Sequence, residues 1–399
     1  MEAGPENIWM ASAGRLKMDD SLTQRFPAAQ VAVTLVNTSA LLRQFVEVPY
    51  RIYHRDPHWV PPLRRDERRR LTPGRYPFFR HADMTLFLAM DGDRVCGRIA
   101  AIEDRLYEEL RGERIAWFGF FEADTAATAQ RLLGAVEEWA RARGLPIVRG
   151  PVNPSLNDSG GLLVNGFESD PYVLMPYNPP SYAGFVEQAG YRKAKDLFAW
   201  SLDLSVPLGR RIELVAARTA RRHGVTVRTV NLREFDAELA TLQTIYREAW
   251  QDNWGFVPPT DAEVRQLAHE LKPILDSELL LFAEIEGRPV ACAVAIPDVN
   301  QVLKKMGGRL FPFGLLHFLN RRRTITQVRA LLVGVLPAYR KTGLYPLLIA
   351  DIHRRAVARG YIRGEMSWTL EDNTAINAGI EAAGGRRSKT YRIYERPVG

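Results

Sequence analysis

Three short segments of this 399-residue chain recur at one fixed distance, which is the sequence sign of an internal duplication. They are a tryptophan before a Pro-Pro pair, an acidic-Gly turn between apolar runs, and a glycine that follows a Glu-x-Ala sequence. The matched residues are Trp59 with Trp254, Gly92 with Gly287, and Gly190 with Gly385, and each pair is 195 residues apart. The chain is therefore expected to contain two copies of one fold.

Each copy has the same predicted order of elements. A helix and a Trp-Pro-Pro loop precede a β-hairpin with an acidic-Gly turn, and a further strand then leads into an amphipathic helix. The first helices are expected at 38–55 and 232–250, and the strand-to-helix units at 115–121 into 126–143 and at 327–336 into 345–359. This order predicts an α+β, mixed α/β fold in which each copy has a mixed central sheet flanked by helices.

The spacing between the copies also locates insertions and domain limits. Gly144 and Gly360 each end a helical run but lie 216 residues apart, so the second copy has about 21 additional residues before its helix. We place this insertion at 303–323. The expected domains are a disordered leader at 1–29, an N-terminal domain at 30–205, a linker at 206–224 and a C-terminal domain at 225–399.

Composition limits the classes of function. The two cysteines, Cys96 and Cys292, lie in apolar runs, and no histidine lies at metal-ligand spacing, so we expect a cytoplasmic protein without disulfide or metal. No signal sequence or run of about 18 apolar residues is present in the sequence. The net charge of +8 suits an anionic partner, but no nucleic-acid-binding module accompanies it, and nucleic acid is not expected to bind.

The second copy contains a strand, a basic turn and a helix in direct succession, at 333–348. This order directs the backbone N–H groups of a helix N-terminus at a ligand beyond the strand. Arg340 and Lys341 add positive charge, and Gly343 permits close approach of the backbone. The pattern is typical of a pyrophosphate-binding turn, although an ordinary turn with surface cations would look similar.

This segment resembles motif A of the GNAT acyltransferases, [Arg/Gln]-x-x-Gly-x-[Gly/Ala], with Arg340 and Gly343 at two of its fixed positions and Tyr345 at the third. The resemblance covers roughly residues 30–399 as a tandem pair. It implies that the turn holds the pyrophosphate of an acyl-CoA, the donor substrate. The implied donor-binding residues are Val333, Val335, Arg340, Lys341, Thr342, Gly343, Leu344, Tyr345 and Asn373.

The corresponding turn of the first copy differs in charge. It carries Glu122 and Asp124 where a phosphate would lie, and it has no glycine before its helix. Because carboxylates would repel a pyrophosphate, we expect that this copy serves as a scaffold and as a wall of the substrate site.

Acyl transfer to an amine requires a proton acceptor for the amine and a donor for the leaving thiolate. Glu365 and Glu371, on and after the strand that follows the second helix, are candidate catalytic carboxylates, and Ser367 and Trp368 are candidate substrate contacts. Glu365 would equally fit a structural ion pair with an arginine. GNAT enzymes often carry a tyrosine seven residues beyond the residue matching Asn373, but Ile380 stands here. Tyr391, Tyr394 and Tyr345 are therefore the remaining candidates for the acid.

Two insertions add candidates. The turn-rich loop 150–161 is either a surface loop or a cover over the substrate cleft, with Asn153, Asn157 and Asp158 facing substrate. The apolar insertion at 303–323 lies between basic clusters. It suits a segment in the headgroup region of an anionic membrane, a core helix, or a wall around an acyl chain.

The Trp-Val-Pro-Pro segment, the loop at 150–157 and the closing segment 384–397 resemble one family of tandem GNAT-like proteins, similar to bacterial ceramide synthases. The resemblance implies an N-acyltransferase that uses acyl-CoA or acyl-carrier protein to acylate a lipid amine. It also implies that the protein contacts the membrane peripherally. Two alternatives stay open: a GNAT acetyltransferase acting on a small amine or a protein, and a non-catalytic acyl-CoA sensor or scaffold.

Overall fold

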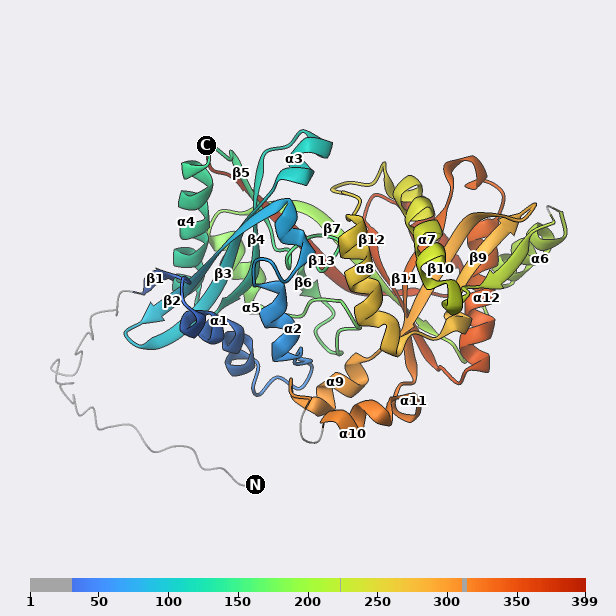
Figure 1. Cartoon of the computed structure of the whole chain (residues 1–399), viewed down its shortest axis with the longest axis horizontal. Coiled ribbons are helices and arrows are strands. Elements are labelled where there is room, and N and C mark those ends of the chain that lie inside the picture. The colour runs from blue at the N-terminus through green and yellow to red at the C-terminus, as the bar shows by residue number, and fades with distance from the viewer. Residues whose placement is uncertain (1–30, 223, 311–313) are drawn as a thin grey trace, which may run out of the picture. The chain divides into compact units, whose positions relative to one another are not determined.

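One mixed sheet of thirteen strands forms the centre of the computed structural model, which describes residues 31–222, 224–310 and 314–399 (Figure 1). The predicted leader at 1–29 lies outside the described residues. The strand order is β1-β2-β3-β4-β5-β13-β7-β12-β11-β10-β9-β8, with β6 paired to β13. The predicted mixed α/β fold is confirmed.

The N-terminal half follows the predicted order of elements. Its strands are β1 (Ala32–Leu35), β2 (Ala82–Asp91), β3 (Arg94–Asp104), β4 (Ile115–Ala123), β5 (Ile147–Gly150), β6 (Leu162–Asn165) and β7 (Arg192–Asp203). Its helices are α1 (Ser39–Ile52), α2 (Arg64–Arg70), η1 (Pro77–Arg80), α3 (Arg105–Arg111), α4 (Ala126–Ala142) and α5 (Ser181–Gln188). The side chain of Thr38 caps α1 and that of Thr125 caps α4, so both predicted helices begin at polar capping residues.

The C-terminal half repeats this order and adds elements. Its strands are β8 (Thr226–Thr229), β9 (Leu280–Ile285), β10 (Arg288–Pro297), β11 (Gln327–Val335), β12 (Arg363–Leu370) and β13 (Arg386–Pro397). Its helices are α6 (Arg210–Arg222), η2 (Leu232–Glu234), α7 (Phe235–Trp250), α8 (Asp261–Leu271), η3 (Lys272–Ile274), η4 (Ser277–Leu279), α9 (Asn300–Met306), α10 (Gly314–Leu319), α11 (Arg321–Thr324), η5 (Pro337–Tyr339), α12 (Leu344–Ala358) and α13 (Thr374–Ala382). The range expected as a linker thus contains α6, which packs on α12 through Ile212 and Ala216.

The two halves exchange their last strands. β13 lies between β5 and β7, and β7 in turn pairs with β12. Each half therefore completes the sheet of the other, and residues 31–399 form one compact unit.

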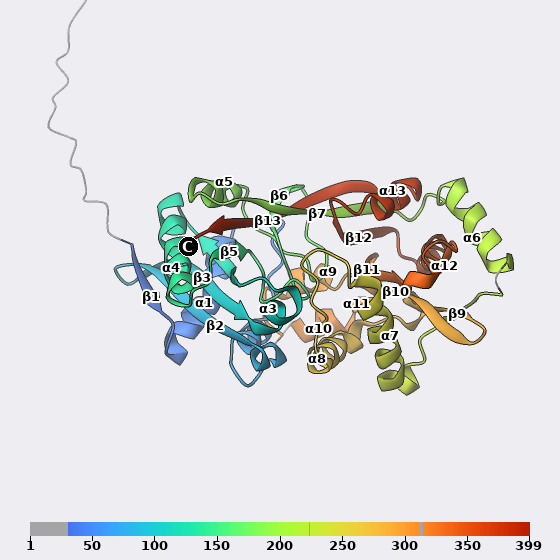
Figure 2. The ribbon, with the colours of Figure 1, turned by 90° about the horizontal axis from the view of Figure 1, so that it is seen from above.

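Helices cover both faces of this sheet (Figure 2). α5, α12 and α13 lie on one face, and α1, α7 and α8 lie on the other. Alternating side chains of β10 follow this division: Ala291 and Ala293 pack in the core with α12, whereas Cys292 packs with Ile245 of α7. The layer formed by α7 and α8 carries the candidate site.

Candidate active site

The basic turn of the second half has the geometry of an anion-binding helix N-terminus. Gly343 precedes α12 with φ of 87°, a conformation in which other residues are strained. The first N–H groups of a helix have no partner within it, so those after Gly343 remain available for a ligand. Arg340 and Lys341 are exposed beside them. These features fit the pyrophosphate of an acyl-CoA.

The turn is contacted by α7 on one side and by α6 on the other. On one side, the Arg340 guanidinium donates to the carbonyl oxygen of Ala249 at the end of α7 (Nη2 to O, 3.1 Å). On the other side, Thr219 of α6 donates to the carbonyl oxygen of Thr342 (Oγ1 to O, 3.2 Å). A methyl group on Gly343 would lie 2.3 Å from Thr219 Oγ1, so glycine is also required for the packing of α6 on the turn.

The other predicted donor contacts lie around this turn. Leu344 is buried and Tyr345 is half-buried, and both belong to the core under α12. Val333 and Val335 lie on β11, which leads to the turn. Asn373 caps α13, because its Oδ1 accepts from the backbone N–H of Ile376.

The parallel strands β11 and β12 separate on the way to the turn. They pair from Gln327 with Arg363 to Ala330 with Met366, and no pairing between them follows along their described lengths. Diverging strands leave backbone groups that can bind an extended ligand such as a pantetheine arm.

A cavity of about 250 Å³ begins at this divergence. Leu331, Leu332, Ser367 and Trp368 line it where the strands separate, and α7 and α8 close it from the solvent side. The apolar residues of the two helices that face it include Leu239, Leu242, Val264, Leu267 and Leu271. The cavity is therefore mainly apolar and suits a hydrocarbon chain.

Arg329, Ser367 and Glu365 form a buried polar group at the strand divergence, and the first two line the cavity. Ser367 donates to Glu365 (Oγ to Oε1, 2.6 Å), and Arg329 donates to Ser367 (Nε to Oγ, 2.8 Å). Ser367 therefore connects the cavity to a carboxylate that lies behind the cavity wall.

Burial controls the proton affinity of this group. Loss of solvent raises the pKa of Glu365, and the hydrogen bond from Ser367 and the charge of Arg329 act against this rise. Burial similarly raises the pKa of the nearby Asp298 to about 7. A carboxyl group with a raised pKa is suited to accept a proton from a substrate amine near neutral pH.

The N-terminal half supplies one wall of the cavity through the loop that the sequence singled out. Asn157 and Asp158 both line it. Asn157 donates to the carbonyl oxygen of Val257 in the other half (Nδ2 to O, 2.9 Å). Asp158 accepts from the hydroxyl groups of Tyr76 and Ser155. Its pKa is raised by burial.

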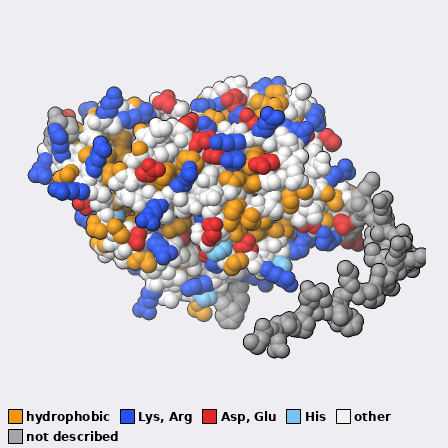
Figure 3. Space-filling view, turned by 180° about the vertical axis from the view of Figure 1, so that it is seen from behind, with side chains coloured by type: hydrophobic (Ala, Val, Ile, Leu, Met, Phe, Trp, Pro, Cys, Tyr) orange, Lys and Arg blue, Asp and Glu red, His pale blue; other side chains and the backbone are white. Residues whose placement is uncertain are grey.

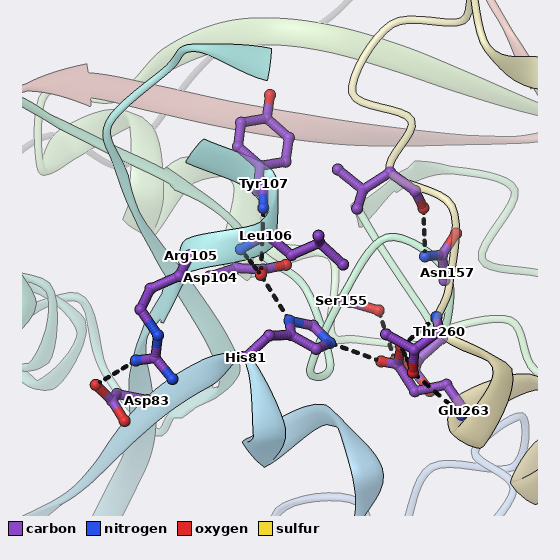
Figure 4. A network of polar contacts seen from close by, with 12 residues as sticks. His81, Asp83, Asp104, Arg105, Leu106, Tyr107, Ser155, Asn157, Thr260 and Glu263 are labelled. Carbon is purple, nitrogen blue, oxygen red and sulfur yellow. Dashed lines mark hydrogen bonds and ion pairs between the residues drawn. The ribbon is translucent and has the colours of Figure 1, made fainter. Parts of the chain in front are cut away.

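A second polar network fastens α8 to the N-terminal half (Figure 4). The imidazole of His81 contacts Asp104 (Nδ1 to Oδ1, 2.8 Å) and Glu263 of α8 (Nε2 to Oε1, 3.3 Å). Glu263 also accepts from Thr260, which completes a capping box at the start of α8. Hydrogen bonds to the two carboxylates raise the pKa of His81 to about 9, although burial acts against this rise.

The equivalent strand divergence in the N-terminal half is filled by its own chain. β4 and β5 pair only from Ile115 to Trp117. Beyond this point, Val152 donates to the carbonyl oxygen of Phe118 (N to O, 2.9 Å), and Asn153 Oδ1 accepts from the N–H of Phe120 at 2.6 Å. Asn153 thus lies in the sheet of the first half and not on the cavity.

The remaining predicted catalytic residues lie apart from the cavity lining. Glu371 accepts from Lys193 and from the N–H of Asp196. Tyr394 donates to Glu187 (OH to Oε1, 2.9 Å) and is buried in the core of the first half. Tyr391 is fully buried behind Trp368, near Glu365. Among the three candidate tyrosines, Tyr345 is the one at the turn.

Sequence reasoning missed Arg329, Tyr76 and Glu263. Arg329 interrupts the apolar run of β11, and a lone arginine in such a strand is a signal of a buried polar site. Glu263 follows Thr260 by three residues, which is the pattern of a capping box and predicts the start of α8. Tyr76 has no comparable signal because its partner Asp158 is distant in sequence.

The described residues contain no group of three or more His, Cys, Asp and Glu side chains that could hold a metal ion. None of the described helices is both long and apolar enough to cross a membrane.

No family model matches the chain. It is 38% identical over 381 residues to the "Bacterial ceramide synthase" of Caulobacter vibrioides, covering 93% of this chain and 98% of the relative. It is 34% identical to "Protein YghO" of Escherichia coli over 369 residues, covering 90% of this chain and 93% of that protein.

Among solved structures, a tandem GNAT protein from the clavulanic acid biosynthesis pathway has a TM-score of 0.56 at 13% identity, covering 93% of this chain and 99% of that chain. This likeness shows the fold, and the sequence relatives show the family. The protein is an acyltransferase enzyme, so the sensor or scaffold alternative is set aside. The chain belongs to the family of tandem GNAT-fold acyltransferases that includes the bacterial ceramide synthase.

Proposed function

We propose that the protein transfers an acyl group from an acyl-CoA, or from the same thioester on an acyl-carrier protein, to the amino group of a long-chain amine. The observation that carries this proposal is the apolar cavity that begins at the divergence of β11 and β12. An acetyl group needs no such volume, whereas a fatty acyl chain or the tail of a lipid amine does. The name of the Caulobacter relative supports a long-chain amino alcohol as the acceptor.

The donor is assigned to the second half. Its pyrophosphate binds the N–H groups after Gly343, beside Arg340 and Lys341, and its pantetheine arm follows the divergence of the strands. The first half offers neither feature, because Val152 and Asn153 occupy its divergence. It contributes Asn157 and Asp158 to the acceptor side of the cavity.

Ser367 and Glu365 carry the proton. The amine nitrogen attacks the thioester carbonyl carbon, its proton passes to Ser367 Oγ, and the Ser367 proton passes to Glu365 Oε1. The C–N bond forms and the C–S bond breaks, and the proton held by Glu365 returns through Ser367 to the leaving thiolate, which leaves the amide, the free thiol and the ionised carboxylate. Arg329 holds Ser367 in place for this transfer.

The insertion at 303–323 provides contact with an anionic membrane. Leu316 and Leu319 of α10 are 63% and 64% exposed, and Arg322 and Arg323 are exposed next to them. Phe318 of the same helix packs against the same hydrophobic cluster as Leu271 and Leu275, two residues that line the cavity. A lipid acceptor would therefore leave the membrane close to the cavity.

The central experiment measures thiol release and the N-acylated product for a matrix of donors and acceptors. Acetyl-CoA and palmitoyl-CoA are each combined with a sphingoid base and with a short amino alcohol. We expect palmitoyl-CoA with the sphingoid base to exceed acetyl-CoA with the short amine by about tenfold or more in kcat/KM. Equal or greater efficiency with the small pair would replace this proposal by the acetyltransferase alternative.

Two variants test the separate assignments. Arg340→Glu combined with Lys341→Glu is expected to raise KM for palmitoyl-CoA at least tenfold, while Arg354→Glu on the exposed side of α12 serves as its control. Leu316→Asp combined with Leu319→Asp is expected to abolish sedimentation with phosphatidylglycerol vesicles. Leu110→Asp, at an exposed leucine of the first half, is the control for this loss.

A further inference from the structure

The helix α6, which packs on the donor turn, carries a group of exposed basic side chains. Arg210, Arg211, Arg218 and Arg221 are exposed on it, and among the described residues none of the four has an ion pair, while Arg221 donates to the carbonyl oxygen of Ala217 in the same helix. Figure 3 shows basic side chains gathered at the left edge, which is the end of the sheet that carries α6. This cluster lies outside the cavity and takes no part in the acyl transfer described above.

The position of α6 is fixed relative to the turn. Thr219 binds the carbonyl oxygen of Thr342, and both Thr219 and Val215 contact Gly343. Ile212 and Ala216 lie on the same face of α6 and pack in the core under α12. α6 therefore borders the point at which the phosphate of the donor binds under the proposed function, and its exposed arginines lie on the outer face of this helix.

Exposed apolar side chains lie among these arginines. Leu214 is 60% exposed and Val215 is 37% exposed, and Val206, just before the helix, is 56% exposed. The cations of the turn are sufficient to bind the phosphates of a nucleotide, and exposed aliphatic side chains would add little to its binding. A surface with apolar residues inside a basic rim is instead suited to an acidic protein.

We propose that α6 is the docking surface for a small acidic carrier protein that presents its acyl chain on a phosphopantetheine arm. This proposal rests on the proposed function, because the arm must enter at Gly343. The four arginines pair with carboxylates of the carrier, and Leu214 packs against its apolar side chains. The phosphate at the base of the arm then reaches the turn next to Arg340 and Lys341.

The test compares two donors with the same acyl group: palmitoyl-CoA and palmitoyl acyl-carrier protein. Arg211→Glu combined with Arg218→Glu is expected to lower kcat/KM with the carrier-protein donor at least tenfold more than with palmitoyl-CoA. Arg43→Glu combined with Arg75→Glu makes the same charge change at exposed positions of the first half and serves as the control. Leu214→Asp, which leaves the arginines intact, should reproduce the selective loss.

The outcomes separate this inference from the proposed function. If wild-type protein uses palmitoyl-CoA but not the carrier-protein donor, the inference fails and the proposed function stands. An equal loss of kcat/KM with both donors, or no loss with either, also overturns the inference. In the first case α6 would affect both donors alike, and in the second it would affect neither. Transfer from neither donor would overturn the proposed function itself.

Binding provides a measurement that is independent of turnover. Affinity for palmitoyl acyl-carrier protein, followed by fluorescence anisotropy, should fall about tenfold or more between 50 and 200 mM salt, as expected for a docking surface of several ion pairs. The Arg211→Glu and Arg218→Glu variant should bind weakly at both salt concentrations. Wild-type affinity in that variant would contradict the assignment.

Discussion

Ser367 Oγ lies 2.6 Å from Glu365 Oε1. This hydrogen bond links a hydroxyl group that lines the cavity to a carboxylate of a residue that is 2% exposed. The serine is exposed to the cavity at its other side, so the pair can move a proton away from the cavity without admitting water. Arg329, which binds the same serine oxygen, keeps it in this orientation.

The first prediction concerns this pair. Glu365→Gln keeps the volume of the side chain but removes the proton acceptor, and it should lower kcat about a hundredfold with little change in the donor KM. In wild type, kcat should increase with pH through the pKa of Glu365, because the carboxylate is the active form and burial raises its pKa above 4.5. Steady-state kinetics from pH 5 to 9 measure both effects.

The matched control for Glu365→Gln is Glu381→Gln, at an exposed position of α13. Ser367→Ala should lower kcat in a similar way, because it breaks the link between cavity and carboxylate. Thermal unfolding separates a loss of chemistry from a loss of fold. Wild-type kcat in folded Glu365→Gln would exclude Glu365 as the proton acceptor.

The second prediction concerns the cavity. Leu267→Trp places an indole in the space between α8 and β11 and should shift the preference toward shorter chains. We expect kcat/KM for a long-chain pair to fall about tenfold or more relative to a short-chain pair, since a pocket discriminates strongly against groups that it cannot hold. Competition between chain lengths, analysed by mass spectrometry, measures the shift. Leu110→Trp, on the surface, is the control, and an unchanged preference in Leu267→Trp would contradict the role of the cavity.

The third prediction concerns the network of His81. Its folded-state pKa of about 9 lies above the unfolded value of 6.5, so the contribution to stability is fully present below about pH 6.5 and is lost as the pH rises through 9. Discounted for solvent screening, this contribution is about 1 to 2 kcal/mol. His81→Gln should therefore lower the free energy of unfolding at pH 6 by this amount.

Urea unfolding at pH 6 and at pH 10 tests this dependence, and the difference between His81→Gln and wild type should shrink at the higher pH. The other charged groups in the network are Asp104 and Glu263, and hydrogen bonds from His81 and Thr260 lower the pKa of Glu263 although burial acts against this. His54→Gln, at an exposed histidine, provides the control. An equal deficit at both pH values would mean that His81 acts through packing and not through its charge.

The sequence predicted the fold well wherever the signal was local. The hairpin turns at Gly92 and Gly287 and the strand-to-helix unit that turns at Gly343 follow from turn chemistry and apolar periodicity, and the structure confirms them. The wall residues Asn157 and Asp158 also lie on the cavity. Their assignment to substrate stays a prediction.

What the sequence did not predict depends on contacts between distant segments. His81 meets Glu263 across the boundary between the halves, and Tyr76 meets Asp158 from 82 residues away within the first half. The exchange of β7 and β13 is of the same kind, since either strand has an equally suitable pattern for a place in its own half. One sequence without an alignment carries no record of such pairings.

The fourth prediction follows from the exchanged strands. β13 forms hydrogen bonds to both β5 and β7, so a fragment of residues 31–209 lacks the strand that joins them and exposes two unpaired edges. We expect this fragment alone to aggregate or to lack cooperative unfolding, and the fragment 210–399, without β7, to behave in the same way. Co-expression of both fragments should restore a soluble, active complex, because each supplies the missing strand of the other. Gel filtration and thermal unfolding measure this outcome, and a soluble, cooperatively folded 31–209 fragment would show that the halves are independent domains.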